Sequence, residues 1–355
     1  MVTDPALAQL RDRIVAANTA RTAVRLRGSG TKDFYGENSL GEIVDTRTYA
    51  GIVDYEPSEL VLTARCGTPL SEIEDTLAQQ GQFLAFEPPA YGGDPTIGGV
   101  VAAGLSGPRR ASAGAVRDFV LGASLLDARG QLLNFGGQVM KNVAGFDVSR
   151  LLCGSLGILG LIAQVSLKVL PRPREEVTLR FDRGAGQGLA LFNGWRAKPL
   201  PISATSWHAG VAHVRLSGSP SALRAARDAL GGEALDAGQA QSWWRGLRDQ
   251  THAFFAEQTG SLWRLSLPST TPLDACGADL IEWSGALRWL RSGKPAAEVR
   301  KITEQLGGTA TLWRGPRDTS MFHPLAPVNL ELHRRLKHQF DPQGIFNRGR
   351  LVAEF

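Results

Sequence analysis

A short stretch near the N-terminus has the composition of an anion-binding turn. Residues 27–31 read RGSGT and follow a segment, 22–26, that is predicted to be a strand. Successive N–H groups in a Gly-Ser-Gly turn can form a concave nest for an anion, and Arg27 and Lys32 add positive charge. The stretch would accommodate a diphosphate, but a small glycine-rich turn also has purely structural uses. It matches neither the dinucleotide fingerprint GxGxxG at the start of a helix nor the phosphate loop GxxxxGK[ST].

A second glycine-rich stretch covers residues 87–110. Thr96 is predicted to cap a small-residue helix over 97–103, whose glycines and alanines allow another group to lie close against it. The free amides at the start of this helix would point at whatever lies before Thr96. The stretch is therefore a second candidate for anion binding, and a capped helix is the structural alternative.

A third stretch, residues 140–171, combines glycines with apolar residues. Gly154, Gly157 and Gly160 recur every three residues, and the apolar run 158–170 predicts a buried strand. Each glycine inside a regular element costs about 0.5 to 1 kcal/mol relative to alanine. Such a cluster therefore indicates a compensating contact, which either a bound planar cofactor or close packing of a helix on a strand could supply.

The elements that would position these stretches alternate between short strands and helices, which is an α+β pattern. At 355 residues the chain is long enough for two domains. The C-terminal helix, 325–340, is amphipathic, with Leu330, Leu336 and Phe340 at its expected buried positions. The other predicted elements are helices at 5–20, 69–80 (with Thr68 as its start signal) and 220–230, strands at 42–45, 51–56 and 60–64, and a hairpin of 120–127 with 131–135.

The overall composition narrows the classes of function. The 39 basic and 34 acidic residues are interleaved, so the net charge of +5 permits an anionic ligand but does not favour nucleic acid. The three cysteines are widely spaced, and no CxxC or Cys/His metal spacing is present. His208 and His213, five apart in a strand-like stretch, are predicted to project to opposite faces. The N-terminus does not read as a signal peptide, and no apolar run approaches the roughly 20 residues of a membrane span.

The three glycine-rich stretches, in this order, resemble a known family. The succession RGSGT, GGDPTIGGVVAAGLSGPRR and KNVAGFDVSRLLCGSLGILGLIAQ is similar to the FAD-binding domain of the vanillyl-alcohol oxidase and p-cresol methylhydroxylase superfamily. The segments SLWRLSLPS, IEWSGALRWL and FDPQGIFNRGRL extend the resemblance to the smaller FAD-binding (E) subunits of bacterial glycolate oxidases. The resemblance implies an N-terminally trimmed, two-subdomain FAD-binding domain over 1–170, an α+β cap over 171–325, and a segment, 326–355, that rejoins the first domain.

The same resemblance implies which residues hold FAD. The first stretch would hold the diphosphate, the second would follow the diphosphate and the flavin, and the third would line the adenine and ribose end. Asn142 and Asp147 would lie near the isoalloxazine. Thr31 stands where relatives with covalently bound flavin carry histidine, so the resemblance implies noncovalent FAD, and Leu156 stands where many catalytic relatives carry glutamate. The implied cofactor-binding residues are Arg27, Gly28, Ser29, Gly30, Thr31, Thr96, Ile97, Gly98, Gly99, Gly114, Arg117, Asp118, Asn142, Gly154, Gly157, Ile158, Ile162 and Asn347.

The function implied by the resemblance is oxidation of glycolate, a 2-hydroxy acid, to glyoxylate. The partners would be a larger FAD-linked catalytic subunit and an iron–sulfur subunit, and the location cytoplasmic or at the inner face of the membrane through those partners. No catalytic residue is assigned, because the histidine-rich metal site of catalytic relatives is not found. Arg264 and Arg288 are candidates for binding the substrate carboxylate, although stacking on tryptophan explains each equally well. A stand-alone dehydrogenase and a flavin-free structural subunit remain alternatives.

Overall fold

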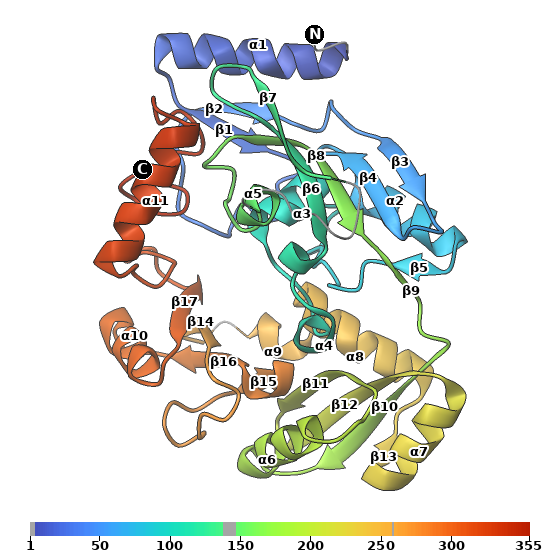
Figure 1. Ribbon diagram of the computed structural model, residues 1–355. Coiled ribbons are helices and arrows are strands. Elements are labelled where there is room, and N and C mark those ends of the chain that lie inside the picture. Colours follow the sequence, from blue (N-terminus) through green and yellow to red (C-terminus); the bar gives the residue numbers. More distant parts are fainter. Residues whose placement is uncertain (1–3, 138–146, 258) are drawn as a thin grey trace. The chain divides into compact units, whose positions relative to one another are not determined.

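The computed structural model describes residues 4–137, 147–257 and 259–355 (Figure 1). They form two compact units. Unit 1 comprises the described parts of Met1–Leu105, Ala115–Pro171 and Pro324–Phe355, and unit 2 comprises Ser106–Gly114 and the described parts of Arg172–His323. Unit 1 is thus discontinuous in sequence, and residues 106–114, which fall within the range predicted for the first domain, group with unit 2.

A five-stranded antiparallel sheet in unit 1 has the order β3-β4-β8-β6-β7. Its strands are β3 (Ile52–Glu56), β4 (Val61–Arg65), β6 (Val120–Leu126), β7 (Leu132–Gly136) and β8 (Leu161–Lys168). Strands β6 and β7 form the hairpin expected from the sequence, and β8 is the predicted buried strand over a shorter range. The sheet thereby places β8, which follows Gly154, Gly157 and Gly160 in the sequence, between β4 and β6.

A parallel pair, β1 (Val24–Arg27) and β2 (Glu42–Asp45), forms a separate small sheet in unit 1. Helix α1 (Pro5–Ala20) packs its apolar positions, among them Leu10 and Ile14, into a core that also contains Phe346 from the C-terminal segment. Val24 bridges to the same Phe346. Beginning and end of the chain therefore meet at β1. A third pair joins β5 (Gln82–Phe83) to β9 (Leu170–Pro171).

Where the sequence predicts helices in unit 1, the structure contains them, but the roles of some of their side chains differ from the prediction. They are α1, α2 (Leu70–Gln79), α3 (Ile97–Ala103), α5 (Val148–Leu151), α11 (Pro327–Phe340) and a 3-10 turn at Val116–Asp118. Thr96 caps α3 as predicted. Thr68 does not cap α2, because its hydroxyl bonds to the backbone of Gly51 and Arg65 instead. In α11 the buried side chain is Lys337, whereas the three apolar positions predicted to be buried are only half-buried.

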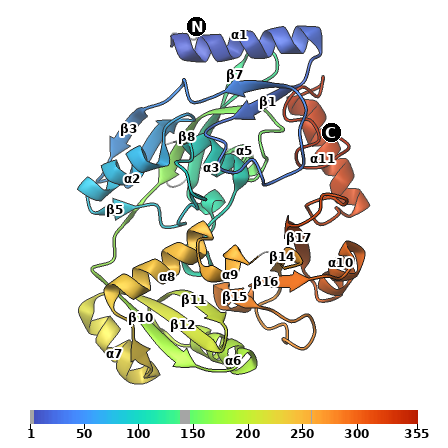
Figure 2. The same cartoon turned by 180° about the vertical axis from the view of Figure 1, so that it is seen from behind.

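Unit 2 is built on an eight-stranded antiparallel sheet of order β13-β10-β12-β11-β15-β16-β14-β17 (Figure 2). Its strands are β10 (Glu175–Asp182), β11 (Ile202–His208), β12 (Val211–Gly218), β13 (Glu233–Ala234), β14 (Ser261–Ser266), β15 (Leu280–Glu282), β16 (Leu287–Ser292) and β17 (Thr309–Arg314). Its helices are α4 (Arg110–Ala113), α6 (Ala185–Arg196), α7 (Pro220–Leu230), α8 (Ala237–Asp249), α9 (Ala253–Ala256), α10 (Ala296–Gln305) and a 3-10 turn at Trp283–Gly285.

Helices cover both faces of this sheet. Helices α6 and α7 pack on one face of β10, β11 and β12, while the indole of Trp244 in α8 bonds to Thr178 on the other face. Helix α10 packs its Val299 against β14 and β17. The fold class predicted from the sequence, α+β with an α+β cap domain, agrees with this architecture.

The placement of two histidines differs from the sequence-based prediction. A tight turn at Ala209 and Gly210 separates His208 on β11 from His213 on β12. The prediction that both histidines lie on one strand and project to opposite faces is therefore wrong. Both rings reach one aromatic cluster, in which His213 lies 4.0 Å from Trp243, Trp243 4.7 Å from His252, and His252 5.3 Å from His208, centroid to centroid. Within the described residues, no group of three potential ligands could hold a metal ion.

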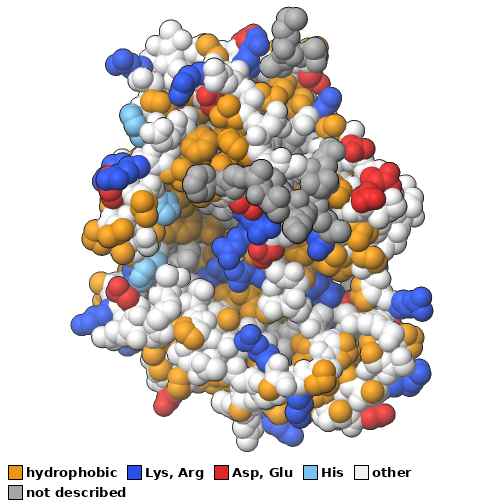
Figure 3. Space-filling model, viewed as in Figure 1, with side chains coloured by type: hydrophobic (Ala, Val, Ile, Leu, Met, Phe, Trp, Pro, Cys, Tyr) orange, Lys and Arg blue, Asp and Glu red, His pale blue; other side chains and the backbone are white. Residues whose placement is uncertain are grey.

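Hydrophobic side chains are exposed on α11, where Val328 is 72% and Leu332 57% exposed. Figure 3 shows hydrophobic side chains mixed with charged ones on this face. Across the part of the chain that the structure covers, no helix combines the length and the apolar character needed to cross a membrane.

Candidate functional site

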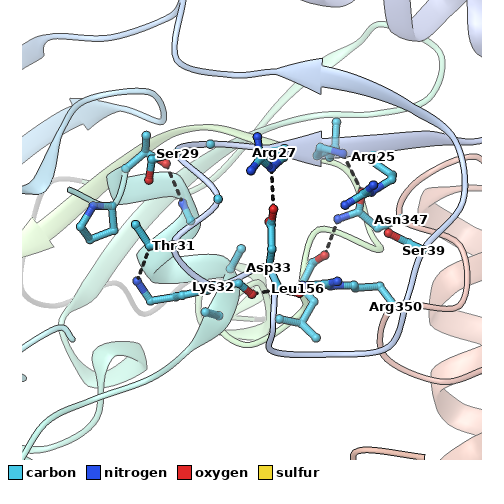
Figure 4. A pocket seen from close by; sticks show the side chains of 18 residues that line it. Arg25, Arg27, Ser29, Thr31, Lys32, Asp33, Ser39, Leu156, Asn347 and Arg350 are labelled. Atoms are coloured by element: carbon cyan, nitrogen blue, oxygen red, sulfur yellow. Dashed lines mark hydrogen bonds and ion pairs between the residues drawn. The ribbon is translucent and has the colours of Figure 1, made fainter. Parts of the chain in front are cut away.

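Two adjoining cavities lie in unit 1. The polar cavity has about 620 Å³ of empty space, part of it open to solvent (Figure 4). It is lined by residues 25–33, Ser39, Pro95, Thr96, residues of α3, Leu156, Asn347 and Arg350. The apolar cavity has about 380 Å³ of empty space, part of it open to solvent, and is lined by residues that include Cys66, Ile162 and four glycines of the second and third glycine-rich stretches. The residues that line both are Leu26, Arg27, Gly28, Gly99, Ala102, Leu156 and Asn347. The three glycine-rich stretches therefore meet at one place.

The turn after β1 presents unused backbone donors to the polar cavity. Among the described residues, no protein atom accepts a hydrogen bond from the amides of Gly28, Ser29, Gly30 or Thr31. Gly28 also allows a close approach, because a Cβ there would lie 2.1 Å from the Thr96 hydroxyl oxygen. A row of free N–H groups against a helix start matches the anion nest predicted from RGSGT.

The start of α3 does not supply the free amides predicted for it. The amide of Ile97 donates to the carbonyl of Thr68 at 2.9 Å, and that of Gly98 donates to the carbonyl of Cys66 at 2.9 Å. The amide of Gly99 donates to the Thr96 hydroxyl at 3.4 Å. This prediction was wrong because α3 begins beside the loop 66–68, whose carbonyls are the nearest acceptors. The helix forms a wall of the site rather than a second anion-binding terminus.

Apart from Arg27, the side chains that line the apolar cavity are uncharged. Burial raises the pKa of the Cys66 thiol to about 12, so it remains uncharged. Ala102 faces both cavities from α3, and Ile162 faces the apolar one from β8. A flat, uncharged ring would suit these walls better than a phosphate would.

The third glycine-rich stretch is held in place by the C-terminal segment. Leu156 and Gly157 both have positive φ, 52° and 74°. The Asn347 side-chain amide donates to the Leu156 carbonyl at 2.6 Å, and its oxygen accepts from the Leu26 amide at 2.7 Å. A Cβ on Gly157 would lie 2.7 Å from the same Asn347 amide nitrogen. Glycine is therefore needed here for close approach as well as for backbone conformation.

A buried ammonium group anchors that segment. Lys337 is 3% exposed, and its Nζ donates to the Ile158 carbonyl, to an Asp341 carboxylate oxygen and to the Phe346 carbonyl, at 2.7, 2.7 and 2.9 Å. Burial lowers the pKa of Lys337, and the carboxylate of Asp341 opposes that shift. Asp341 also accepts from the amides of Ile345 and Phe346. This network fixes the turn that carries Asn347.

The cations around the polar cavity have different partners. Arg27 is paired with Asp33 at 2.7 Å, and Arg350 donates to backbone carbonyls of the segment 32–37. Arg25 lines the same cavity, and no acceptor contacts its guanidinium among the described residues. With Lys32 also in the wall, basic side chains outnumber the single carboxylate of Asp33. The cavity therefore favours an anion.

The structure separates the predicted cofactor residues into two groups. Those that line one or both cavities are Arg27, Gly28, Ser29, Gly30, Thr31, Thr96, Gly98, Gly99, Gly157, Ile162 and Asn347. Those that are not among the lining residues are Ile97, Gly114, Arg117, Asp118, Gly154 and Ile158. Gly114 belongs to unit 2, and Asp118 bonds to the amide of Ala115. Asn142 lies outside the described residues, and Asp147 caps α5.

Several lining residues were missed from the sequence. Arg25, Ser39, Ala102 and Arg350 line the polar cavity but were not among the predicted cofactor residues, although Ala102 and Arg350 lie within quoted segments. A signal existed for Arg25, because residues two apart on a strand share a face and Arg27 was already a candidate. No local pattern marks Arg350, which reaches the cavity only through the fold of the C-terminal segment.

The two arginines of unit 2 that were predicted to bind the substrate carboxylate differ in their contacts. Arg288 is 0% exposed and donates to the carbonyls of Gly285, Pro272 and Thr271. Its surroundings are those of a structural arginine. The Arg264 guanidinium lies 5.1 Å from the ring of Trp283 and 5.8 Å from that of Trp313. Within the described part of the chain, no carboxylate or other hydrogen-bond acceptor contacts it.

Comparison with known proteins shows the family to which the chain belongs. Over 346 residues the chain is 45% identical to the glycolate oxidase subunit GlcE of Escherichia coli, and the match covers 97% of each chain. The chain belongs to the family of that GlcE subunit. The glycolate oxidase subunit GlcD of Bacillus subtilis is 29% identical over 161 residues, which are 45% of this chain and 34% of that protein. A family model described as "FAD binding domain" matches residues 6–136.

Solved structures support the fold of this GlcE-family chain. An alkyldihydroxyacetonephosphate synthase superposes with a TM-score of 0.66 at 14% identity, covering 96% of this chain and 75% of that one. A glucose dehydrogenase, Phl p 4, superposes with a TM-score of 0.61 at 13% identity, covering 98% and 88%. At these identities the likeness shows the fold alone. It is the p-cresol methylhydroxylase type of FAD-binding fold, as the resemblance implied.

The residues around the two cavities fit FAD, the cofactor of this fold. The free amides at Gly28–Thr31 and the excess of basic side chains suit a diphosphate, and the walls of the apolar cavity, uncharged apart from Arg27, suit a ring. Family and fold together identify the chain as an FAD-binding flavoprotein.

Proposed function

We propose that this chain is the FAD-holding subunit of a complex that oxidises glycolate to glyoxylate. The observation that carries the proposal is similarity to a glycolate oxidase subunit across almost the full length of both chains. The cavities in unit 1 support it, because their donors and walls fit the cofactor that such an oxidation needs. FAD, when bound, would accept the hydride from the 2-carbon of the hydroxy acid.

The role of unit 1 in this proposal is to bind and orient the cofactor. The amides of Gly28 to Thr31 hold the diphosphate, and the wall from Gly98 to Ala102 lies along it. Gly157 and Ile162 line the compartment for a ring. Binding is noncovalent, since Thr31 occupies the position where covalently flavinylated relatives of this fold carry histidine.

Electrons must leave the flavin, and the described part of this chain offers no metal cluster for that purpose. The three cysteines are apart in sequence, and no described group of ligands could hold a metal ion. We therefore propose that the chain works beside a larger FAD-linked catalytic subunit and an iron–sulfur subunit, as an accessory or electron-relaying component. Its place is the cytoplasm, or the inner face of the membrane through those partners.

A second candidate is oxidation of the 2-hydroxy acid by this chain itself. The unpaired guanidinium of Arg264, held against two indole rings, favours it. The rings stabilise the cation through their faces, which leaves the N–H edges for a bidentate contact with a carboxylate. Trp283 is rigidly placed for this role: its indole nitrogen donates to the Gly107 carbonyl at 3.1 Å, and it has a positive φ of 53°.

The experiment is anaerobic reduction of the flavin by glycolate, followed by visible absorption, in the isolated chain and in the co-expressed complex. Bleaching only in the complex supports the accessory role. Bleaching in the isolated chain, lost in Arg264→Met but kept in the exposed-surface control Arg174→Met, supports the second candidate. A complex whose flavin glycolate does not reduce would contradict both.

A further inference from the structure

The polar cavity has two polar ends. Figure 4 shows Ser29 and Thr31 on one side of the cavity, and Arg25, Ser39 and Asn347 on the other. The first end carries the free amides of the turn. Both ends adjoin the apolar cavity, because Gly28 at the first end and Asn347 at the second line both cavities.

Unlike Arg27 and Arg350, Arg25 has no partner for its guanidinium among the described residues. Arg27 has a carboxylate partner and Arg350 donates to four carbonyls. Arg25 is half-buried on β1, and no carboxylate, carbonyl or ring contacts its guanidinium within the described residues. A partly desolvated cation without a counter-charge is unfavourable, so an anionic ligand at this end would gain a charge-assisted hydrogen bond at little further cost.

Ser39 supplies a second unused polar group at the same end. It is 8% exposed, and no hydrogen bond of its hydroxyl is found among the described residues. A hydroxyl both donates and accepts, which suits the vicinal hydroxyls of a ribose. Arg25 and Ser39 come from different segments, the strand β1 and the loop that precedes β2, so the fold rather than local sequence brings them together.

We propose that Arg25 and Ser39 bind the adenosine 5′-phosphate half of FAD and give this site its preference for FAD over FMN. Arg25 pairs with the phosphate next to the adenosine, and Ser39 bonds to the ribose. The amides of Gly28 to Thr31 hold the diphosphate, including the phosphate of the flavin half, so binding of FMN depends on them and not on Arg25. The inference rests on FAD binding by unit 1 and names residues that no sequence motif marked.

The test is titration of the flavin-stripped full chain with FAD and separately with FMN, followed by flavin fluorescence. Arg25→Met keeps the apolar stem of the side chain and removes its charge. We expect its Kd for FAD to rise about 10- to 100-fold, the range for a lost charge-assisted hydrogen bond. Its Kd for FMN should stay within about twofold of the wild-type value. Ser39→Ala should act in the same direction with a smaller loss, and adenosine 5′-phosphate should compete with FAD more weakly in both variants.

The matched control is Arg47→Met, because Arg47 is a surface arginine of the same unit, paired with Asp45 and absent from both cavity walls. It should bind both flavins as the wild type does. Equal losses of FAD and FMN affinity in Arg25→Met, unchanged FAD affinity, or a wild-type chain that binds neither flavin would each overturn the proposal. Failure of the proposed function has a different signature: FAD remains bound with the expected selectivity, but glycolate does not reduce it in the complex.

Discussion

The Asn347 side-chain amide donates to the Leu156 carbonyl at 2.6 Å, and both residues have positive φ, 40° and 52°. Through its oxygen the same side chain accepts from the amide of Leu26. One side chain thus joins the strand before the diphosphate turn to the wall of the apolar cavity. The contact spans 191 positions of sequence on one side and 321 on the other.

Replacing Asn347 should therefore damage the cavity walls. In Asn347→Gly the conformation is easily accommodated, but the Leu26 amide and the Leu156 carbonyl lose their partners, for an expected loss of about 1 to 3 kcal/mol of unfolding free energy. Asn347→Ala should lose more, since alanine is strained at positive φ. Urea unfolding and FAD affinity measure both effects. Wild-type stability in the glycine variant would show that these two bonds contribute nothing.

The buried pair of Lys337 and Asp341 should be far more sensitive than a surface pair. Lys337→Met leaves the carboxylate of Asp341, which is 1% exposed, without its cation, and we expect a loss of about 3 to 5 kcal/mol. Lys294 and Glu298 form an exposed ion pair with the same spacing, so Lys294→Met should cost less than about 1 kcal/mol. Denaturant unfolding compares the two variants, and similar losses would contradict the anchoring role of Lys337.

Stability should depend on pH through His213. Burial, assisted by Arg180 and His252 and opposed by Asp182, lowers the pKa of His213 from 6.5 to about 4. The unfolded chain then binds more protons between these values, so stability falls as pH drops from about 6.5 to about 4. The total loss is about 3 kcal/mol. His213→Phe, which keeps the ring against Trp243, should flatten this profile in urea titrations at several pH values. His338→Gln, on the exposed part of α11, is the control, and an equally steep profile in His213→Phe would refute the assignment.

Filling the cavities should remove the flavin without unfolding the chain. Ala102 faces both cavities from within α3, so a larger side chain there occupies ligand space without backbone strain. We expect Ala102→Leu to purify with little FAD and Ala102→Ser to keep it, by the ratio of flavin to protein absorbance. Gly98 is a poor site for the same test, because a Cβ there would lie 2.7 Å from Cys66 Cβ and disturb the core instead. Full occupancy in Ala102→Leu would place the cofactor elsewhere.

The sequence correctly predicted structural features that depend on a few neighbouring residues, and it failed for features that depend on residues far apart in the chain or on an unrecognised turn. The cap at Thr96, the β6–β7 hairpin and the range of α7 each follow from a few neighbouring residues, and the structure agrees. The amides of α3 were assigned wrongly because their acceptors lie in a loop about thirty positions earlier. His208 and His213 were assigned wrongly because a short turn was taken for continuous strand.

The residues of the candidate site also differ in whether the sequence could predict them. The turn at Gly28–Thr31 was visible because glycine spacing encodes its conformation. Arg25 could have been found by extending strand alternation two residues back. Ser39 and Arg350 could not, because each reaches the cavity through a non-local packing of loops that no period or motif describes.

The anchoring of the cavity walls by Lys337, Asn347 and Arg350 also sets an order of events during synthesis. A ribosome makes these residues after it has made the whole of unit 2. Until then β1 lacks its bond to Asn347, and the carbonyls at 32–37 lack Arg350. Cofactor loading therefore follows synthesis of these residues, and a product that stops before residue 337 would contain unit 2 but no assembled flavin compartment.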